Sequence, residues 1–163
     1  MTLADLSCER ELDVPELAEL AQDLAAMPNL WREHVVHDPA QRMFHKVLAT
    51  EHVTAWLICW MPGHDTGFHD HDGSGGAVAV IQGQVREERL RIGDVAASAV
   101  AGPGDLLRFG PADIHRVLHH GTEPAVTLHA YSPVLRRMGA YELDAHGRLL
   151  RFALDEDTEL KAA

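Results

Sequence analysis

His69, Asp70 and His71 form the triplet in this sequence with the strongest potential for chemistry. Successive side chains of a β-strand point to opposite faces, so the two imidazoles would share one face while Asp70 lies on the other. Two imidazoles on one wall can chelate a metal ion. The triplet therefore predicts half of a metal site, and the rest of the chain must supply the other ligands.

Short apolar or alternating runs begin at Arg42, and glycine, proline or aspartate separates them. This pattern is typical of an all-β sandwich or barrel. It shows no fixed repeat period, so it does not indicate a propeller or a solenoid. We expect strands at residues 43–49, 53–61, 67–71, 76–82, 84–90, 94–100, 105–109, 114–119, 124–131 and 138–144.

The N-terminal part of the chain has a helical pattern instead. Residues 14–27 place leucines at helical spacing, with Asp13 as a possible N-cap and Pro15 in the first turn. A weaker helix is expected over residues 30–37, before Pro39.

At 163 residues and 46% hydrophobic, the chain is expected to form one domain. We divide that domain into an N-terminal helical segment (1–41), a β-barrel (42–144) and a C-terminal strand or tail (145–163).

The charge balance of the chain excludes several classes of partner. Twenty-five acidic and fourteen basic residues give a formal charge of −11, which would repel nucleic acid and anionic membranes. The sequence has no long apolar run and no signal-peptide pattern, and its two cysteines, Cys8 and Cys59, imply no disulfide framework. We expect a cytoplasmic protein whose oligomeric state is left open.

Two spaced motifs resemble those of the cupin family. The first has Gly63, five residues, His69-x-His71, four residues, Gly76, six residues and Gly83; the second has Gly104, five residues, Gly110, Ala112, His115 and His119. The resemblance implies a mainly β fold, a double-stranded β-helix or jelly-roll-like barrel, with the N-terminal α-helices added to it.

Gly76 is the main departure from the cupin pattern, since most cupins carry a metal-binding glutamate there. The resemblance then implies a site of three histidines, His69, His71 and His115. Such a ligand set leaves about three positions open for an anionic substrate and for dioxygen. An arrangement of two histidines and one carboxylate would need an acid at position 71, where His71 stands.

Residues 113–138 and 60–83 resemble cysteine dioxygenase and related thiol dioxygenases, and the resemblance extends over roughly residues 42–144. It implies a non-haem Fe(II) enzyme that adds both atoms of O2 to the sulfur of a small thiol and yields a sulfinate. Animal members carry a crosslinking cysteine at the position of Gly76, so Tyr131 is expected to be uncrosslinked, as in the bacterial branch.

Thr127, His129 and Tyr131 alternate on one expected strand and so share a face. By position they resemble the three residues that surround the metal site in this family. A hydroxyl can orient an imidazole, which can in turn hold a phenol over the metal. Tyr131 is therefore the candidate to bind the substrate carboxylate or oxygen. Ser132-Pro133 resembles a family turn whose proline bond is cis.

Arg42 and Lys46 are the candidates to bind a substrate carboxylate. They lie four residues apart and would share a strand face, although a surface location for both is an equal alternative. The family's arginine aligns with Lys46, which offers a point charge rather than a two-pronged donor. The substrate is therefore left open between L-cysteine and a relative such as 3-mercaptopropionate.

Two other classes of protein fit the same motifs. Three histidines also suit zinc with an open position, as in a metal-dependent isomerase or hydrolase. A cupin that binds a small molecule without catalysis is the second alternative.

Overall fold

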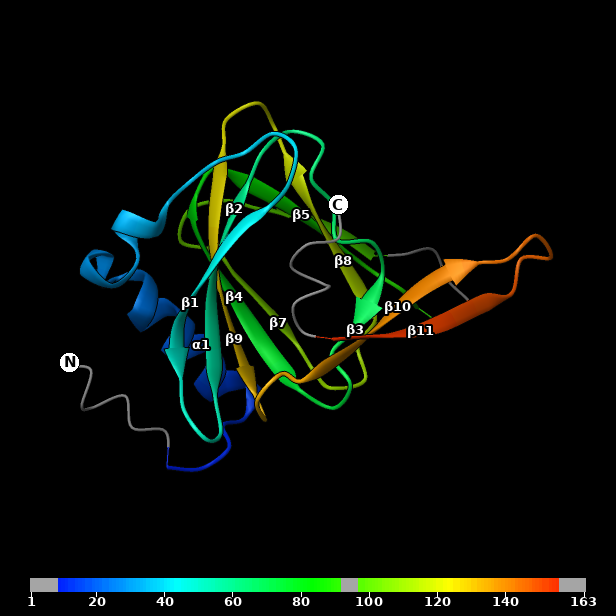
Figure 1. Cartoon of the computed structure of the whole chain (residues 1–163), viewed down its shortest axis with the longest axis horizontal. Coiled ribbons are helices and arrows are strands. Elements are labelled where there is room, and N and C mark those ends of the chain that lie inside the picture. Colours follow the sequence, from blue (N-terminus) through cyan, green and yellow to red (C-terminus); the bar gives the residue numbers. More distant parts are fainter. Residues whose placement is uncertain (1–8, 92–96, 156–163) are drawn as a thin grey trace.

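Two antiparallel β-sheets face each other around a common interior (Figure 1). The computed structural model describes residues 9–91 and 97–155. The sheets have the orders β1-β2-β9-β4-β7 and β11-β10-β3-β8-β5-β6. The strands are β1 (Met43–Ala49), β2 (Thr54–Trp60), β3 (His69–Asp70), β4 (Gly75–Gln82), β5 (Gln84–Arg89), β6 (Ala97–Ala101), β7 (Leu106–Phe109), β8 (His115–His120), β9 (Ala125–Ser132), β10 (Arg137–Leu143) and β11 (Leu149–Asp155).

The five-stranded sheet is covered on both faces, and β9 shows why. Every residue of this strand is buried. Tyr131 belongs to the inner cluster of the barrel, whereas Leu128 and Ala130 pack with the N-terminal helix on the outside. Alternation along one strand thus places Tyr131 in the interior and the residues that contact the helix on the outside.

Helix α1 (Val14–Ala25) lies against the outer face of this sheet (Figure 1). The predicted N-cap is confirmed: the Asp13 carboxylate accepts a hydrogen bond from the Glu16 backbone N–H, and the Glu16 carboxylate accepts one from the Asp13 backbone N–H. Leu17 and Leu24 are fully buried. Each buried leucine contributes about 1.5–3 kcal/mol relative to an exposed one.

The helix predicted at residues 30–37 is wrong. Two single 3-10 turns, η2 (Pro28–Leu30) and η3 (Arg32–His34), stand there, and neither has a side-chain cap. Trp31 separates them with a backbone φ of −135° and donates its indole N–H to the carbonyl of Leu24 at 3.2 Å. The contact with α1 therefore overrides the weak helical pattern.

The predicted strands agree with the structure apart from their ends. The strand predicted at residues 67–71 is only β3, because Gly67 and Asp72 on either side have positive φ angles of 68° and 47°. The strand predicted at 94–100 appears as β6, and its residues 94–96 lie outside the described residues. The segment predicted as a C-terminal strand or tail contains β11; residues 156–163 of that segment also lie outside them. The division into 1–41, 42–144 and 145–163 stays a prediction.

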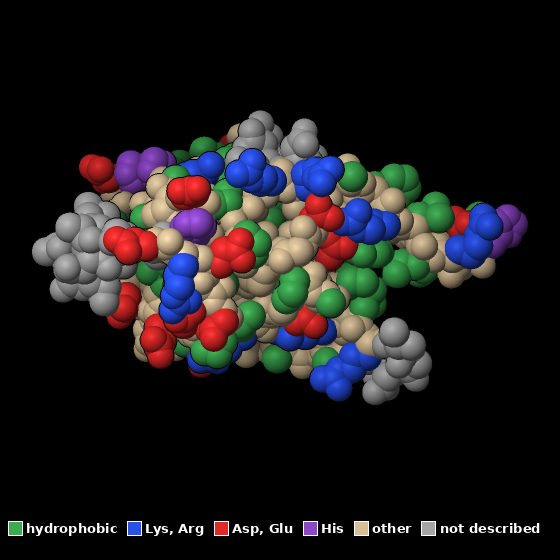
Figure 2. All heavy atoms as spheres, turned by 90° about the horizontal axis from the view of Figure 1, so that it is seen from below, with side chains coloured by type: hydrophobic (Ala, Val, Ile, Leu, Met, Phe, Trp, Pro, Cys, Tyr) green, Lys and Arg blue, Asp and Glu red, His purple; other side chains and the backbone are tan. Residues whose placement is uncertain are grey.

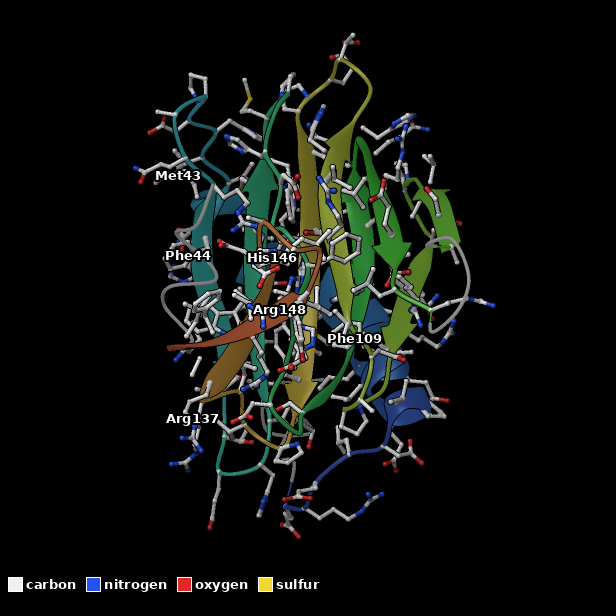
Figure 3. The ribbon with its side chains drawn as sticks, turned by 90° about the vertical axis from the view of Figure 1, so that its right-hand side faces the viewer. Met43, Phe44, Phe109, Arg137, His146 and Arg148 are labelled. Carbon is white, nitrogen blue, oxygen red and sulfur yellow. The ribbon has the colours of Figure 1, made fainter. Side chains whose placement is uncertain are left out.

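Strands β10 and β11 form a hairpin that projects from the barrel (Figures 1 and 2). Its turn carries His146 and Arg148, which Figure 3 shows from the hairpin end. Near its base, Gly139 and Ala140 pair with Asp70 and His69 of β3. The hairpin is therefore built onto the strand that carries the first metal-ligand candidate. None of the helices in the described residues has the length and apolar character needed to cross a membrane.

Candidate metal centre

Three imidazole rings meet in the interior of the barrel. His69 lies on β3 directly opposite His115, the first residue of β8, and His71 follows β3. The ring centroids are 4.9 Å apart for His69 and His71, 4.7 Å for His69 and His115, and 5.1 Å for His71 and His115. One nitrogen from each ring lies within 4.8 Å of the other two, and all three side chains are buried. This arrangement can hold a metal ion.

Hydrogen bonds to Nδ1 orient two of the three rings. His69 Nδ1 lies 2.9 Å from the carbonyl oxygen of Gly67, and His115 Nδ1 lies 2.8 Å from Glu87 Oε1. An N–H at Nδ1 leaves Nε2 with the lone pair that binds a metal. Among the residues that the structure describes, neither ring nitrogen of His71 has a hydrogen-bond partner.

The electrostatics of the cluster also suit a metal. Burial holds the pKa of His69 and of His71 well below the usual value for histidine, and the neighbouring histidines lower each pKa further. Metals bind neutral imidazole. A buried polar nitrogen without a partner costs free energy, which coordination at His71 would recover. The residues present therefore fit a metal ion.

Asp70 points away from the cluster, as the alternation of the H-x-H triplet predicts. Its carboxylate accepts hydrogen bonds from Arg151 at 2.8 and 2.9 Å, from the Tyr141 hydroxyl at 2.5 Å and from the Gly139 backbone at 3.1 Å. A Cβ at Gly139 would lie 2.2 Å from Arg151 Nε, so glycine makes room for this arginine. Asp70 thus links β3 to the hairpin of β10 and β11 through these hydrogen bonds.

Gly76 makes room for an aromatic ring beside the site. It lies opposite Tyr131 on β9 and opposite Phe109 on β7. A Cβ at position 76 would lie 2.3 Å from Phe109 Cζ and 2.5 Å from its Cε2. The Phe109 ring, labelled in Figure 3, is stacked on His71 with centroids 4.4 Å apart. Phe109 therefore occupies the space that a side chain at position 76 would need.

Tyr131 has no cysteine opposite it at position 76. Within residues 9–91 and 97–155 the free cysteine is Cys59, which packs in another cluster with Leu57 and Val126.

The predicted cis bond between Ser132 and Pro133 is confirmed.

Thr127, His129 and Tyr131 form the hydrogen-bonded chain that their spacing predicts. Thr127 Oγ1 lies 2.8 Å from His129 Nε2, and His129 Nδ1 lies 3.1 Å from Tyr131 Oη. Trp60 Nε1 donates to Thr127 Oγ1 at 2.8 Å. Burial, with the nearby charges of His115 and Arg42, lowers the pKa of His129 to about 3, so the ring is neutral near pH 7. This hydrogen-bonded chain ends close to the metal-ligand candidates, because the Tyr131 and His71 rings are 5.2 Å apart.

Arg42 and Lys46 differ in burial, although both lie over tryptophans of the inner cluster. Arg42 is 3% exposed, with its guanidinium carbon 5.3 Å from the Trp60 ring, and its charge lowers the pKa of His69 and of His129. Lys46 is exposed, with its ammonium 4.3 Å from the Trp56 ring. Of these two candidates, Arg42 is therefore the one that is buried beside the inner cluster and acts on the site histidines.

Neither the contact of Glu87 with His115 nor the partners of Asp70 were predicted from the sequence. A signal for Glu87 exists: it alternates with Val85 on a strand whose inner face should be apolar, and a carboxylate at such a position needs a partner. No comparable signal pairs Asp70 with Arg151, since 81 residues separate them.

Comparison with solved structures supports the cupin architecture. A protein from Klebsiella pneumoniae with a double-stranded β-helix domain covers 74% of this chain and 91% of its own, with a TM-score of 0.54 and 17% identity. KdgF from Halomonas sp. covers 64% of this chain and 92% of its own, with a TM-score of 0.53 and 21% identity. The predicted mainly β cupin fold is confirmed, and these likenesses concern the fold alone.

Comparison with protein families identifies the class within this fold. The model of cysteine dioxygenase type I matches residues 1–144. Human cysteine dioxygenase type 1 is 26% identical over 145 residues, which is 81% of this chain and 71% of that protein. The Danio rerio protein of the same name is 27% identical over 146 residues, with the same coverage. The chain belongs to the cysteine dioxygenase type I family and is thus a thiol dioxygenase, an oxidoreductase.

Proposed function

We propose that the protein is a non-haem iron(II) enzyme that converts a small thiol acid and O2 to the sulfinate, with L-cysteine or a relative such as 3-mercaptopropionate as the substrate. One observation carries this proposal. The three-histidine cluster and the chain that ends in Tyr131 face the same interior, with the His71 and Tyr131 rings 5.2 Å apart.

His69, His71 and His115 would each hold the ion through one ring nitrogen. When bound, iron(II) supplies the redox chemistry that lets O2 react with a thiolate. Because neutral imidazoles add no negative charge, the net charge of the site favours an anionic thiolate and carboxylate.

Arg42 is the residue that we assign to the substrate carboxylate. Its guanidinium can donate two parallel hydrogen bonds, and its burial beside Trp60 strengthens them. Lys46 lies exposed over Trp56 and is the weaker candidate.

Tyr131 is the residue that we assign to hydrogen bonding with the bound substrate. The Thr127 oxygen already accepts a hydrogen bond from Trp60, and its own proton can be donated to His129 Nε2. His129 then carries its proton on Nδ1 and donates it to the Tyr131 oxygen, so the phenol proton is directed away from His129. This chain therefore orients Tyr131 without any net charge.

The overall reaction balances as RSH + O2 giving RSO2H. Sulfur loses four electrons, O2 gains them, and both oxygen atoms end on sulfur. The proposal places this reaction in the cytoplasm, where a reducing environment keeps thiols available.

An oxygen-uptake assay tests the function. The protein is first loaded with iron(II) under anaerobic conditions, and the thiol and O2 are then added. We expect thiol-dependent uptake and a sulfinate product, and we expect His115→Ala to abolish both. His120→Ala is the matched control, because His120 lies on the same strand and contacts Arg86 instead of the cluster. Tight zinc binding with no thiol-dependent uptake by the iron-loaded protein would refute the proposal.

Turnover of L-cysteine, 3-mercaptopropionate and cysteamine identifies the substrate class. We expect both acids to react faster than cysteamine, which lacks a carboxylate. Arg42→Met should raise KM for the acids, whereas Lys46→Met should change it little. Equal turnover of cysteamine and the acids would rule out a carboxylate clamp.

A further inference from the structure

Glu87 is a buried carboxylate with no role in the proposed reaction. Its side chain is 7% exposed, and Oε1 accepts a hydrogen bond from His115 Nδ1 at 2.8 Å. Arg89 Nη2 lies 3.0 Å from the same oxygen. A buried carboxylate is costly unless it is paired and hydrogen-bonded. Its place beside a metal-ligand candidate therefore calls for an explanation.

We propose that Glu87 is a positioning residue of the metal centre and acts through His115. This inference rests on the proposed three-histidine metal site. By accepting the proton on Nδ1, Glu87 fixes the tautomer in which Nε2 presents its lone pair to the ion. Its negative charge also makes the imidazole a stronger donor to the metal.

The other two histidines make different contacts in the described part of the chain. His69 donates to a neutral backbone carbonyl, and neither nitrogen of His71 is hydrogen-bonded within the described residues. The Nδ1 of His115 thus bonds to a carboxylate, whereas the Nδ1 of His69 bonds to a carbonyl. Glu87, which is paired with Arg89, contacts the Nδ1 side of the ring and so takes no coordination position itself.

Strand β5 explains why Glu87 can take this role and its neighbour cannot. Glu87 alternates with the fully buried Val85 on the inner face of β5. Arg89 lies opposite His115 in the pairing of β5 with β8, which brings its guanidinium to the Glu87 carboxylate. Glu88 points the other way and lies 3.5 Å from Arg116 Nη1. Glu88 is therefore a matched control: the same residue type one position along the same strand.

Metal affinity tests the proposal without measuring turnover. Co(II) is titrated into apoprotein in competition with a chromophoric chelator, for wild type, Glu87→Ala, Glu87→Gln and Glu88→Gln. We expect the Kd for Co(II) to rise about 10–100-fold in Glu87→Ala. Glu87→Gln keeps an oxygen acceptor but not the charge, so a smaller rise is expected, and Glu88→Gln should match wild type.

The possible results separate this inference from the proposed function. Equal Co(II) affinity in wild type and both Glu87 variants would overturn the role of Glu87 and leave the metal site standing. A wild-type protein that does not bind Co(II) would refute the metal site itself. If Glu87→Ala does not fold, Glu87→Gln has nearly the same volume and provides the comparison.

The tautomer of His115 provides a readout that a purely structural role would not change. In apoprotein labelled with ¹⁵N-histidine, NMR should show His115 protonated on Nδ1 in wild type and in Glu88→Gln. Glu87→Ala should lose this preference. A wild-type His115 protonated on Nε2 would overturn the proposal.

Discussion

Replacing Gly76 by alanine is expected to disturb the metal centre through Phe109. The added Cβ would lie 2.3 and 2.5 Å from two carbons of the Phe109 ring and 2.9 Å from the carbonyl oxygen of Ala130. The ring must move, and it is stacked on His71. The change therefore reaches a metal-ligand candidate even though position 76 has no polar atom in its side chain.

The expected size of the effect is that of overpacking in a core, about 1–3 kcal/mol of unfolding free energy. For a chain of this length that corresponds to a fall in Tm of roughly 2–12 °C. Metal affinity should fall as well, because the displaced ring shifts His71.

Urea unfolding of apoprotein and Co(II) titration measure these two effects. Gly75→Ala is the control on the same strand, since its Cβ would come no closer than 3.2 Å to Val14 Cγ2. Phe109→Leu removes the two ring carbons that the new Cβ meets. In that background Gly76→Ala should cost less by about 1 kcal/mol or more. A residual cost is expected from the contact with Ala130.

Two outcomes would refute the reasoning about position 76. The first is a cost of Gly76→Ala no larger than that of Gly75→Ala. The second is an equal cost of Gly76→Ala with and without Phe109→Leu, because the clash with the ring would then not be its cause.

Three further predictions concern residues around the site. Thr127→Val should lower kcat about 10-fold with Co(II) affinity unchanged, because it frees His129 from its hydroxyl partner; unchanged turnover in the oxygen-uptake assay would contradict this. His129→Gln tests the buried neutral imidazole. Below pH 6.5 the unfolded wild-type chain takes up a proton that the folded His129, with a pKa of about 3, does not, so wild-type stability decreases as the pH is lowered. In urea unfolding, the stability difference between wild-type and His129→Gln apoproteins should therefore narrow by about 1.4 kcal/mol from pH 7.5 to pH 5.5. A difference that does not change with pH would exclude a lowered pKa at His129. Arg151→Met should destabilise the protein by about 1–2 kcal/mol, because Asp70 loses two charge-assisted hydrogen bonds; the range is reduced because the Arg151 side chain is 38% exposed. Thermal unfolding measures the loss, with Arg148→Met at an exposed position as the control. Equal Tm values for Arg151→Met and Arg148→Met would contradict the prediction.

Local pattern in the sequence was sufficient for much of the molecule. Alternation predicts that His69 and His71 share a face and that Asp70 points away, and the structure places all three in this way. The same rule puts Thr127, His129 and Tyr131 on one face of β9, where they form one hydrogen-bonded chain. These predictions succeed because the two-residue period of a strand depends only on neighbouring residues.

Contacts between different structural elements decided the rest. Trp31 donates a hydrogen bond to α1 where a second helix was predicted, and Asp70 pairs with Arg151, which is 81 residues away in the sequence. The register between β5 and β8 brought Glu87 into contact with His115. Burial distinguished Arg42 from Lys46, although both are cations and their spacing predicts the same strand face. The sequence by itself determined which side chains share a face, because backbone geometry sets that locally. Only the tertiary structure decided which faces meet and which charges are removed from water, because both depend on how the two sheets pack.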